Sequence, residues 1–225
     1  MEQLDTFSTY FFILAHPDDE VYSCVLMKRL VEQKKKVHVL YATSGDAQGL
    51  AQMREQEVCK SMSFIGVASE NVHFLRIPER KVLDQLDMVV RGIITLAQRY
   101  SPDCVVGQDY EGGHEAHDAI SFCTSEIVRL LRISNHFVFP LYHGKPQERK
   151  GARFKPSREE IIVLLLSECE RKLKEEVLIC HCSQQFHFDG LTRSAEDYFS
   201  LLLEREIYYR VKNPIDYSER PLAEV

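Results

Sequence analysis

The 225-residue sequence lacks several features that would place it in a special class of protein. It has no apolar run approaching the ~20 residues needed to span a bilayer, and no basic start followed by the apolar stretch of a secretory signal peptide. It has no basic excess, because the net charge is -6, so no nucleic-acid surface is expected. It also has no internal repeat and no low-complexity segment. We therefore expect a cytoplasmic globular protein whose partners are neither membranes nor nucleic acids.

The sequence also lacks the paired cysteines of a disulfide framework. Its seven cysteines are odd in number and lie scattered through apolar segments, which is typical of reduced, buried thiols. Cys180-His181-Cys182 invites interpretation as a metal site. However, the run falls at the end of a predicted helix, where neighbouring side chains point apart, so we do not predict a metal there.

Strands and helices alternate through the first two thirds of the chain. Short apolar runs predict strands at 10–15, 37–42, 72–77, 104–107 and 137–142. Amphipathic runs between them predict helices at 21–33, 50–65, 83–100 and 117–132. This alternation predicts an α/β fold: a single Rossmann-like domain over residues 1–225, with a mostly parallel sheet and helices on both faces.

Two later segments differ from this pattern. Residues 143–158 are rich in basic residues, glycine and proline, and we expect a mobile loop. It is either a lid that meets an anionic part of a substrate or a solvated charged loop. Residues 194–225 are expected to form a C-terminal helix and tail, with an amphipathic helical pattern from Ser194 to Val211. Its aromatic cluster indicates packing, either within the chain or at the interface of a homo-oligomer.

The stretch Ala15-His16-Pro17-Asp18-Asp19-Glu20 follows the first predicted strand. His16 and Asp19 are three residues apart and can converge on one metal ion, while Asp18 stays available to handle a proton. The structural alternative is a strand-to-helix turn in which Asp18 caps the helix. We favour half of a mononuclear metal site with its own base.

A second polar stretch, Gly112 to Asp118, follows the fourth predicted strand. His114 and His117 are three apart at the start of a helix, so one could complete the metal site and the other could lie over a substrate. Three protein ligands and one open position are typical of catalytic zinc, which lowers the pKa of bound water towards ~7. Asp18 would then take the proton of the attacking water, and His114 would donate to the oxyanion.

These motifs resemble the PIG-L/LmbE family of zinc-dependent de-N-acetylases, which act on N-acetylglucosamine conjugates. The matching stretches are Ala-His-Pro-Asp-Asp-Glu after the first strand, Thr-Ser-Gly-Asp at 43–46 after the second, and Gly-His-x-x-His after the fourth. The resemblance implies a role for each of seven residues: His16, Asp19 and His117 as zinc ligands, Asp18 as general base, His114 as helper at the oxyanion or leaving amine, Arg54 as a substrate contact, and Gln184 in a Ser-Gln pair that is structural or near the substrate.

The sequence departs from the family pattern at two positions. The second motif usually reads His-Pro-Asp-His, and Ala116 here replaces the aspartate that tunes the neighbouring histidine. Some members carry a tyrosine where this chain has Gly112, and Tyr110 could substitute from a different position. These departures bear on catalytic efficiency and substrate more than on the metal.

Three hypotheses follow. The first is a zinc-dependent de-N-acetylase that removes acetyl from an N-acetylated amino sugar, a small-molecule conjugate, by attack of metal-activated water. The second keeps the metal site but makes the protein an amidase or esterase on a non-sugar substrate. The third is a non-catalytic metal- or sugar-binding protein. Fe²⁺ suits the same ligands as Zn²⁺, and the sequence does not decide the metal, the aglycone or the oligomeric state.

Overall fold

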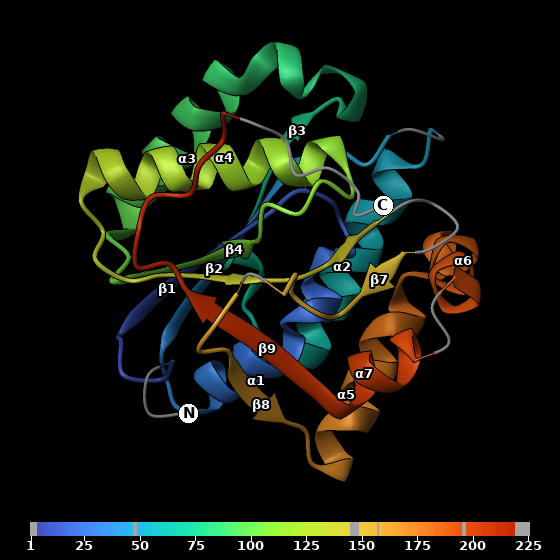
Figure 1. Cartoon of the computed structure of the whole chain (residues 1–225). Helices are drawn as coiled ribbons and strands as arrows, with labels where there is room; N and C mark the ends of the chain where they lie inside the picture. The colour runs from blue at the N-terminus through green and yellow to red at the C-terminus, as the bar shows by residue number, and fades with distance from the viewer. Residues whose placement is uncertain (1–3, 47–48, 145–148, 157, 195–196, 219–225) are drawn as a thin grey trace.

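The computed structural model describes residues 4–46, 49–144, 149–156, 158–194 and 197–218. Within them, a seven-stranded sheet has the order β3-β2-β1-β4-β5-β9-β8 (Figure 1). The five strands from β3 to β5 are parallel, whereas β9 and β8 complete the sheet in antiparallel pairs. The predicted fold class is therefore confirmed: a mostly parallel α/β sheet of the Rossmann kind.

The main strands and helices have the following bounds. The strands of the sheet are β1 (Thr9–Leu14), β2 (Lys36–Thr43), β3 (Val72–Ile77), β4 (Cys104–Gln108), β5 (His136–Phe139), β8 (Ile162–Leu165) and β9 (Arg205–Arg210). The helices are α1 (Cys24–Glu32), α2 (Ala51–Ile65), α3 (Leu86–Tyr100), α4 (Glu115–Leu131), α5 (Glu168–Cys180), α6 (Gln185–Ser194) and α7 (Tyr198–Glu204). A small hairpin pairs β6 (Tyr142–His143) with β7 (Lys150–Gly151).

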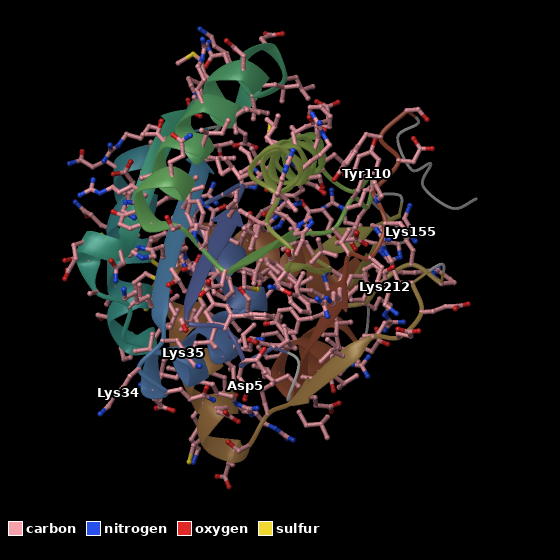
Figure 2. All side chains as sticks on the ribbon, turned by 90° about the vertical axis from the view of Figure 1, so that its left-hand side faces the viewer. Asp5, Lys34, Lys35, Tyr110, Lys155 and Lys212 are labelled. Carbon is pink, nitrogen blue, oxygen red and sulfur yellow. The ribbon has the colours of Figure 1, made fainter. Side chains whose placement is uncertain are left out.

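Helices cover both faces of the sheet, as the apolar runs in the strands require. All six residues of β1 are buried, and successive side chains enter opposite cores. Phe12 packs in a core with α1, α2 and α5, whereas Phe11 and Ile13 pack in a core with α3 and α4. Figure 1 shows these two groups of helices on opposite sides of the sheet. Lys34 lies at the edge of the molecule (Figure 2), and both Lys34 and Lys212 are exposed.

The C-terminal segment differs from the prediction. We expected helix from Ser194 to Val211, but α7 ends at Glu204 and β9 follows it. Two tyrosines and an isoleucine among its six residues suit a strand, and β9 pairs with both β5 and β8. Local helical periodicity was therefore overridden by pairing with strands distant in the sequence.

The strand predicted over 137–142 also differs from the structure, which divides it into β5 and β6. Pro140 lies at the break, and proline has no N–H to donate to a sheet. The basic segment at 143–158 is partly regular, because β7 pairs with β6; residues 145–148 and 157 lie outside the described residues. Among the helices of the described chain, none combines the length and hydropathy that crossing a membrane would demand.

Candidate metal centre

A pocket of about 520 Å³ opens at the carboxyl-terminal edge of the parallel strands. Its wall contains all of the sequence-predicted site residues: His16, Asp18, Asp19, Arg54, His114, His117 and Gln184. The sheet explains why distant turns meet there. Strand β1 lies between β2 and β4, so the chain leaves β1 and β4 side by side, at the point where the strand order reverses and α/β sheets bind ligands.

His16, Asp19 and His117 form a compact group at the floor of this pocket. His16 Nδ1 lies 2.9 Å from His117 Nε2, and His117 Nε2 lies 3.3 Å from Asp19 Oδ1. The other Asp19 oxygen is 3.7 Å from His16 Nδ1 and accepts the backbone N–H groups of Ala15 (3.0 Å) and His16 (2.7 Å). The carboxylate is thus fixed by the turn that leaves β1.

Helix α4 brings His117 into this group. The helix begins at Glu115, about two residues before the predicted start, so His117 lies in its first turn and His114 is its N-cap. The Nδ1 atom of His114 accepts the N–H of Ala116 at 3.2 Å. Ligand atoms of His114, His16 and His117 all lie within 4.8 Å of one another. His114 is therefore a third imidazole beside His16 and His117, the two histidines that Asp19 contacts.

The distances and charges of this group fit a tetrahedral divalent metal. Donor atoms that bind one such ion at 2.0–2.2 Å are about 3.3–3.6 Å apart. The separations here are 2.9, 3.3 and 3.7 Å, the last two to different oxygens of Asp19. Burial lowers the pKa of His117 to about 4, which keeps its ring neutral as a ligand must be. Burial also opposes protonation of His16, but the nearby carboxylates of Asp19 and Glu79 outweigh it and raise its pKa to about 9. The same carboxylates would favour a metal cation bound between these side chains.

Asp18 lies beside this group, with its carboxylate held by Arg54 and its backbone held by Glu20. Arg54 Nη2 is 3.0 Å from Asp18 Oδ1, and the backbone N–H of Asp18 donates to the Glu20 carboxylate at 3.2 Å. The backbone φ of Asp18 is 137°, a conformation that favours glycine. Burial raises the Asp18 pKa to about 6, although the positive charge of Arg54 opposes the rise. A pKa in this range suits a general base at neutral pH.

Arg54 and Gln184 are placed by contacts within the chain. Arg54 donates from Nε and Nη2 to the Pro17 carbonyl, at 3.2 Å and 2.6 Å, so its buried guanidinium supports the turn as well as Asp18. Glu57, one helical turn further, accepts the N–H (2.8 Å) and hydroxyl (2.6 Å) of Ser183. The Gln184 amide donates to the same hydroxyl at 3.1 Å. The Ser-Gln pair therefore lies at the pocket wall, fixed by α2.

Among the pocket residues that the sequence analysis missed, Glu79 and Tyr142 contact the histidines of the candidate site. Glu79 follows β3 just as the recognised motifs follow β1, β2 and β4, so its place at a strand end was the available signal. Tyr142 follows β5 and packs edge-on to His117, with ring centroids 5.4 Å apart. Tyr110, which we considered as a substitute tyrosine, instead packs on Tyr217 with ring centroids 4.6 Å apart.

The Cys180-His181-Cys182 run and most of the described arginines of the basic segment make contacts within the chain outside the candidate metal centre. His181 is completely buried and pairs with Glu20 at 2.7 Å, and the Cys182 thiol contacts Glu57. In the basic segment, Arg153 and Arg158 pair with aspartates elsewhere in the chain. Arg149 lies over the Tyr142 ring, 4.9 Å from its centroid, and lines the pocket. All seven cysteines are free thiols, although Cys59, Cys169 and Cys182 are exposed and not buried as expected.

The fold and the site together define a class of protein: an α/β domain with a candidate histidine–aspartate metal centre at the switch point of its sheet. Comparison with known families then identifies the family. The PIG-L family, described as GlcNAc-PI de-N-acetylase, matches residues 11–128, and the chain belongs to this family. The match covers the turn after β1, helix α2 and the start of α4, which hold six of the seven predicted site residues.

Two curated relatives carry the same name, probable N-acetylglucosaminyl-phosphatidylinositol de-N-acetylase. The chain is 28% identical to the one from Dictyostelium discoideum over 120 residues, which is 49% of this chain and 45% of that protein. It is 31% identical to the one from Schizosaccharomyces pombe over 127 residues, which is 52% of this chain and 51% of that protein. The chain thus spans about half the length of the curated relatives it matches.

Solved structures with the same fold have different activities. N,N'-diacetylchitobiose deacetylase from Pyrococcus horikoshii is 17% identical, with a TM-score of 0.70 over 94% of this chain and 86% of that one. The zinc-inhibited form of teicoplanin deacetylase Orf2 is 15% identical, with a TM-score of 0.67 over 91% and 100%. GalB from Pseudomonas putida, a 4-carboxy-2-hydroxymuconate hydratase, is 13% identical, with a TM-score of 0.62 over 94% and 99%. At these identities the likeness concerns the fold alone.

Proposed function

We propose that this protein is a zinc-dependent de-N-acetylase that hydrolyses the acetamide of an N-acetylated amino sugar within a small-molecule conjugate. The observation that carries the proposal is the convergence of His16, Asp19 and His117 at the floor of a pocket, with the separate carboxylate of Asp18 beside them. A site that only bound a metal would need the three ligands but no base.

The residues around the candidate ligands have distinct roles in this reaction. A divalent metal bound there would make a water molecule acidic enough to ionise near neutral pH. Asp18 would accept the proton of the attacking water, with its carboxylate held in place by Arg54. The Nε2 proton of His114 would face the oxyanion of the tetrahedral intermediate. Asp18 could then pass its proton to the leaving amine.

The substrate class is supported by the family and by the pocket. Both curated relatives are named for an N-acetylglucosamine conjugate, and the pocket is large enough for a sugar. Its wall also includes the Arg149 guanidinium and the Phe186 ring, which is 83% exposed. These groups offer an apolar and a cationic surface to whatever the sugar is attached to.

The test is acetate release by the purified, zinc-loaded protein from a panel of N-acetylglucosamine conjugates. We expect turnover on at least one conjugate and none after chelation. Failure on every sugar, with zinc bound, would count heavily against the proposal.

A second candidate keeps the metal site but replaces the sugar with another amide or ester. It is favoured by Gly112 and Ala116 in place of the usual family residues. Acylated amines and simple esters in the same panel separate the two candidates. A non-catalytic binding protein is the third hypothesis, and an Asp18→Ala variant tests it, because a binding protein would be indifferent to the loss of the base.

Two further expectations from the sequence stay predictions. A cytoplasmic location can be tested by fractionating cells that express the protein. A homo-oligomer can be tested by light scattering of the purified protein. Neither result affects the assignment of the reaction.

A further inference from the structure

Glu79 lies where two turns at the carboxyl-terminal edge of the sheet meet. It follows Pro78 directly after β3, and its backbone N–H donates to Asp46 Oδ1 at 2.9 Å. The N–H of Ser44 in the same turn as Asp46 donates to the Ile77 carbonyl, also at 2.9 Å. The backbone that carries Glu79 is therefore tied to the Thr-Ser-Gly-Asp turn.

One oxygen of Glu79 faces two imidazoles at once. Glu79 Oε1 lies 3.5 Å from His16 Nε2 and 3.5 Å from His114 Nε2. The His16 and His114 rings themselves meet edge to face, with centroids 4.9 Å apart. The Glu79 side chain is only 17% exposed, so bulk water contributes little screening to this contact.

The neighbours of each ring decide which nitrogen carries the proton. His16 Nδ1 faces His117 and Asp19, so a ligating lone pair belongs there and the proton belongs on the buried Nε2. That Nε2 makes no hydrogen bond within the described chain, and Glu79 is the carboxylate nearest to it. His114 Nδ1 accepts the Ala116 N–H, so its proton also lies on Nε2, facing Glu79.

We infer that Glu79 is a positioning residue that holds both imidazoles in the Nε2–H form. This leaves His16 Nδ1 for the metal, and it keeps on His114 Nε2 a proton that faces Glu79 in the free protein and would turn to the oxyanion when substrate is bound. Metal-binding histidines usually donate their second N–H to an outer carboxylate or carbonyl, which fixes the ring and raises its basicity. Glu79 would be this outer carboxylate both for His16, a candidate metal ligand, and for the neighbouring His114. The inference rests on the proposed metal-dependent function.

The test compares Glu79→Ala and Glu79→Gln with the matched control Glu70→Gln. Glu70 is an exposed glutamate outside the pocket. Zinc affinity is measured by competition with a chromogenic chelator, and ¹⁵N chemical shifts of the histidine rings report their tautomers. We expect Glu79→Ala to weaken zinc binding about 10- to 100-fold, to shift the Nε2 signals of His16 and His114, and to leave the melting temperature of the metal-free protein unchanged. Glu79→Gln, which keeps one acceptor oxygen, should lie between wild type and Glu79→Ala.

Two results would overturn the inference. One is a folded Glu79→Ala variant with wild-type zinc affinity and unchanged ring signals. The other is unchanged zinc affinity with a raised KM, which would make Glu79 a substrate contact. Affinity and ring signals do not depend on turnover. If the wild-type protein binds zinc but deacetylates no conjugate, the proposed function fails while the role of Glu79 is still decided.

Discussion

At the scale of single residues, Asp18 is set apart from its neighbours by its contacts. Asp19 accepts two backbone N–H groups and contacts both imidazoles of the metal centre, so it is committed to that centre. Asp18 contacts Arg54 instead, and Glu20 accepts the backbone N–H of Asp18 while pairing with His181. Three consecutive acidic residues therefore have three different environments.

The first prediction concerns Asp18. Asp18→Asn keeps the size of the side chain but removes the base, so we expect kcat to fall about 10²- to 10⁴-fold while zinc content stays at the wild-type level. Steady-state kinetics and elemental analysis of the same preparation check this. The exposed Asp84→Asn should behave as wild type. Turnover that survives in Asp18→Asn would assign the base to another residue.

The second prediction concerns the buried Glu111. Burial raises its pKa to about 7, although the His143 imidazole 3.5 Å away and the hydrogen bond from the Leu141 N–H oppose the rise. The folded state therefore holds a proton that the unfolded state, with a pKa near 4.5, releases at lower pH. The resulting stability is fully present below pH ~4.5 and is lost as the pH rises through ~7.

Glu111→Gln stays neutral and removes this dependence. We expect it to exceed wild type in free energy of unfolding by roughly 1–3 kcal/mol at pH 8 and by much less at pH 5. Urea unfolding at the two pH values measures the difference. An equal effect of the substitution at both values would show that Glu111 does not titrate between them.

At the scale of elements, the sequence predicted β1 to β4 and the helices between them to within a few residues. These elements have strong local patterns: buried apolar runs for strands and one-sided stripes for helices. The same approach failed for β9, because its residues also fit a helical stripe and its strand conformation depends on pairing with β5 and β8. A strand that forms only by pairing with strands distant in the sequence has no local sequence pattern that predicts it.

Strand β9 also supplies a buried acid, Glu206, that stabilises α1. Its carboxylate accepts the N–H groups of Val25 and Leu26, each at 2.9 Å, and pairs with Lys174 of α5 at 2.9 Å. Both charged side chains are fully buried. The start of α1, which has no side-chain cap of its own, is thus capped from the far end of the chain.

The third prediction follows from this contact. Glu206→Ala leaves Lys174 buried without its partner, so we expect a loss of about 3–5 kcal/mol in the free energy of unfolding. Adding Lys174→Met should recover part of the loss, because no uncompensated charge remains. Glu168→Ala, which breaks the exposed pair with Lys172, is the control and should change little. Chemical denaturation measures all four proteins, and a Glu206→Ala variant as stable as the control would contradict the argument.

At the scale of the whole molecule, the candidate metal centre joins parts of the chain about one hundred residues apart. His16 and Asp19 belong to the turn after β1, whereas His117 belongs to α4. The sequence indicated both halves and the edge of the sheet where they lie. It did not give the strand order β2-β1-β4, which makes the two turns neighbours, and it gave no sign of contacts such as Arg54 with Asp18 or Glu79 with His114. Those contacts depend on where α2 and the turn after β3 lie in space.

The fourth prediction is that zinc stabilises the whole fold. A ligand that binds only the folded state at one hundred times its Kd adds about 2.7 kcal/mol. We therefore expect zinc to raise the melting temperature by several degrees and EDTA to reverse the rise. His117→Ala should abolish the response, whereas His73→Ala, outside the pocket, should retain it. Calorimetry checks this, and an equal zinc response in His117→Ala would place the ion elsewhere.

The backbone of Asp18, with φ at 137°, is in a conformation that costs conformational energy for any residue except glycine. Glycine would relieve the strain there, and no glycine could accept a proton. Selection of random variants for thermal stability alone should therefore enrich glycine at position 18. We expect these variants to have a raised melting temperature and no deacetylase activity. On the proposed function, the aspartate at this position exchanges some conformational stability for a carboxylate that can accept a proton.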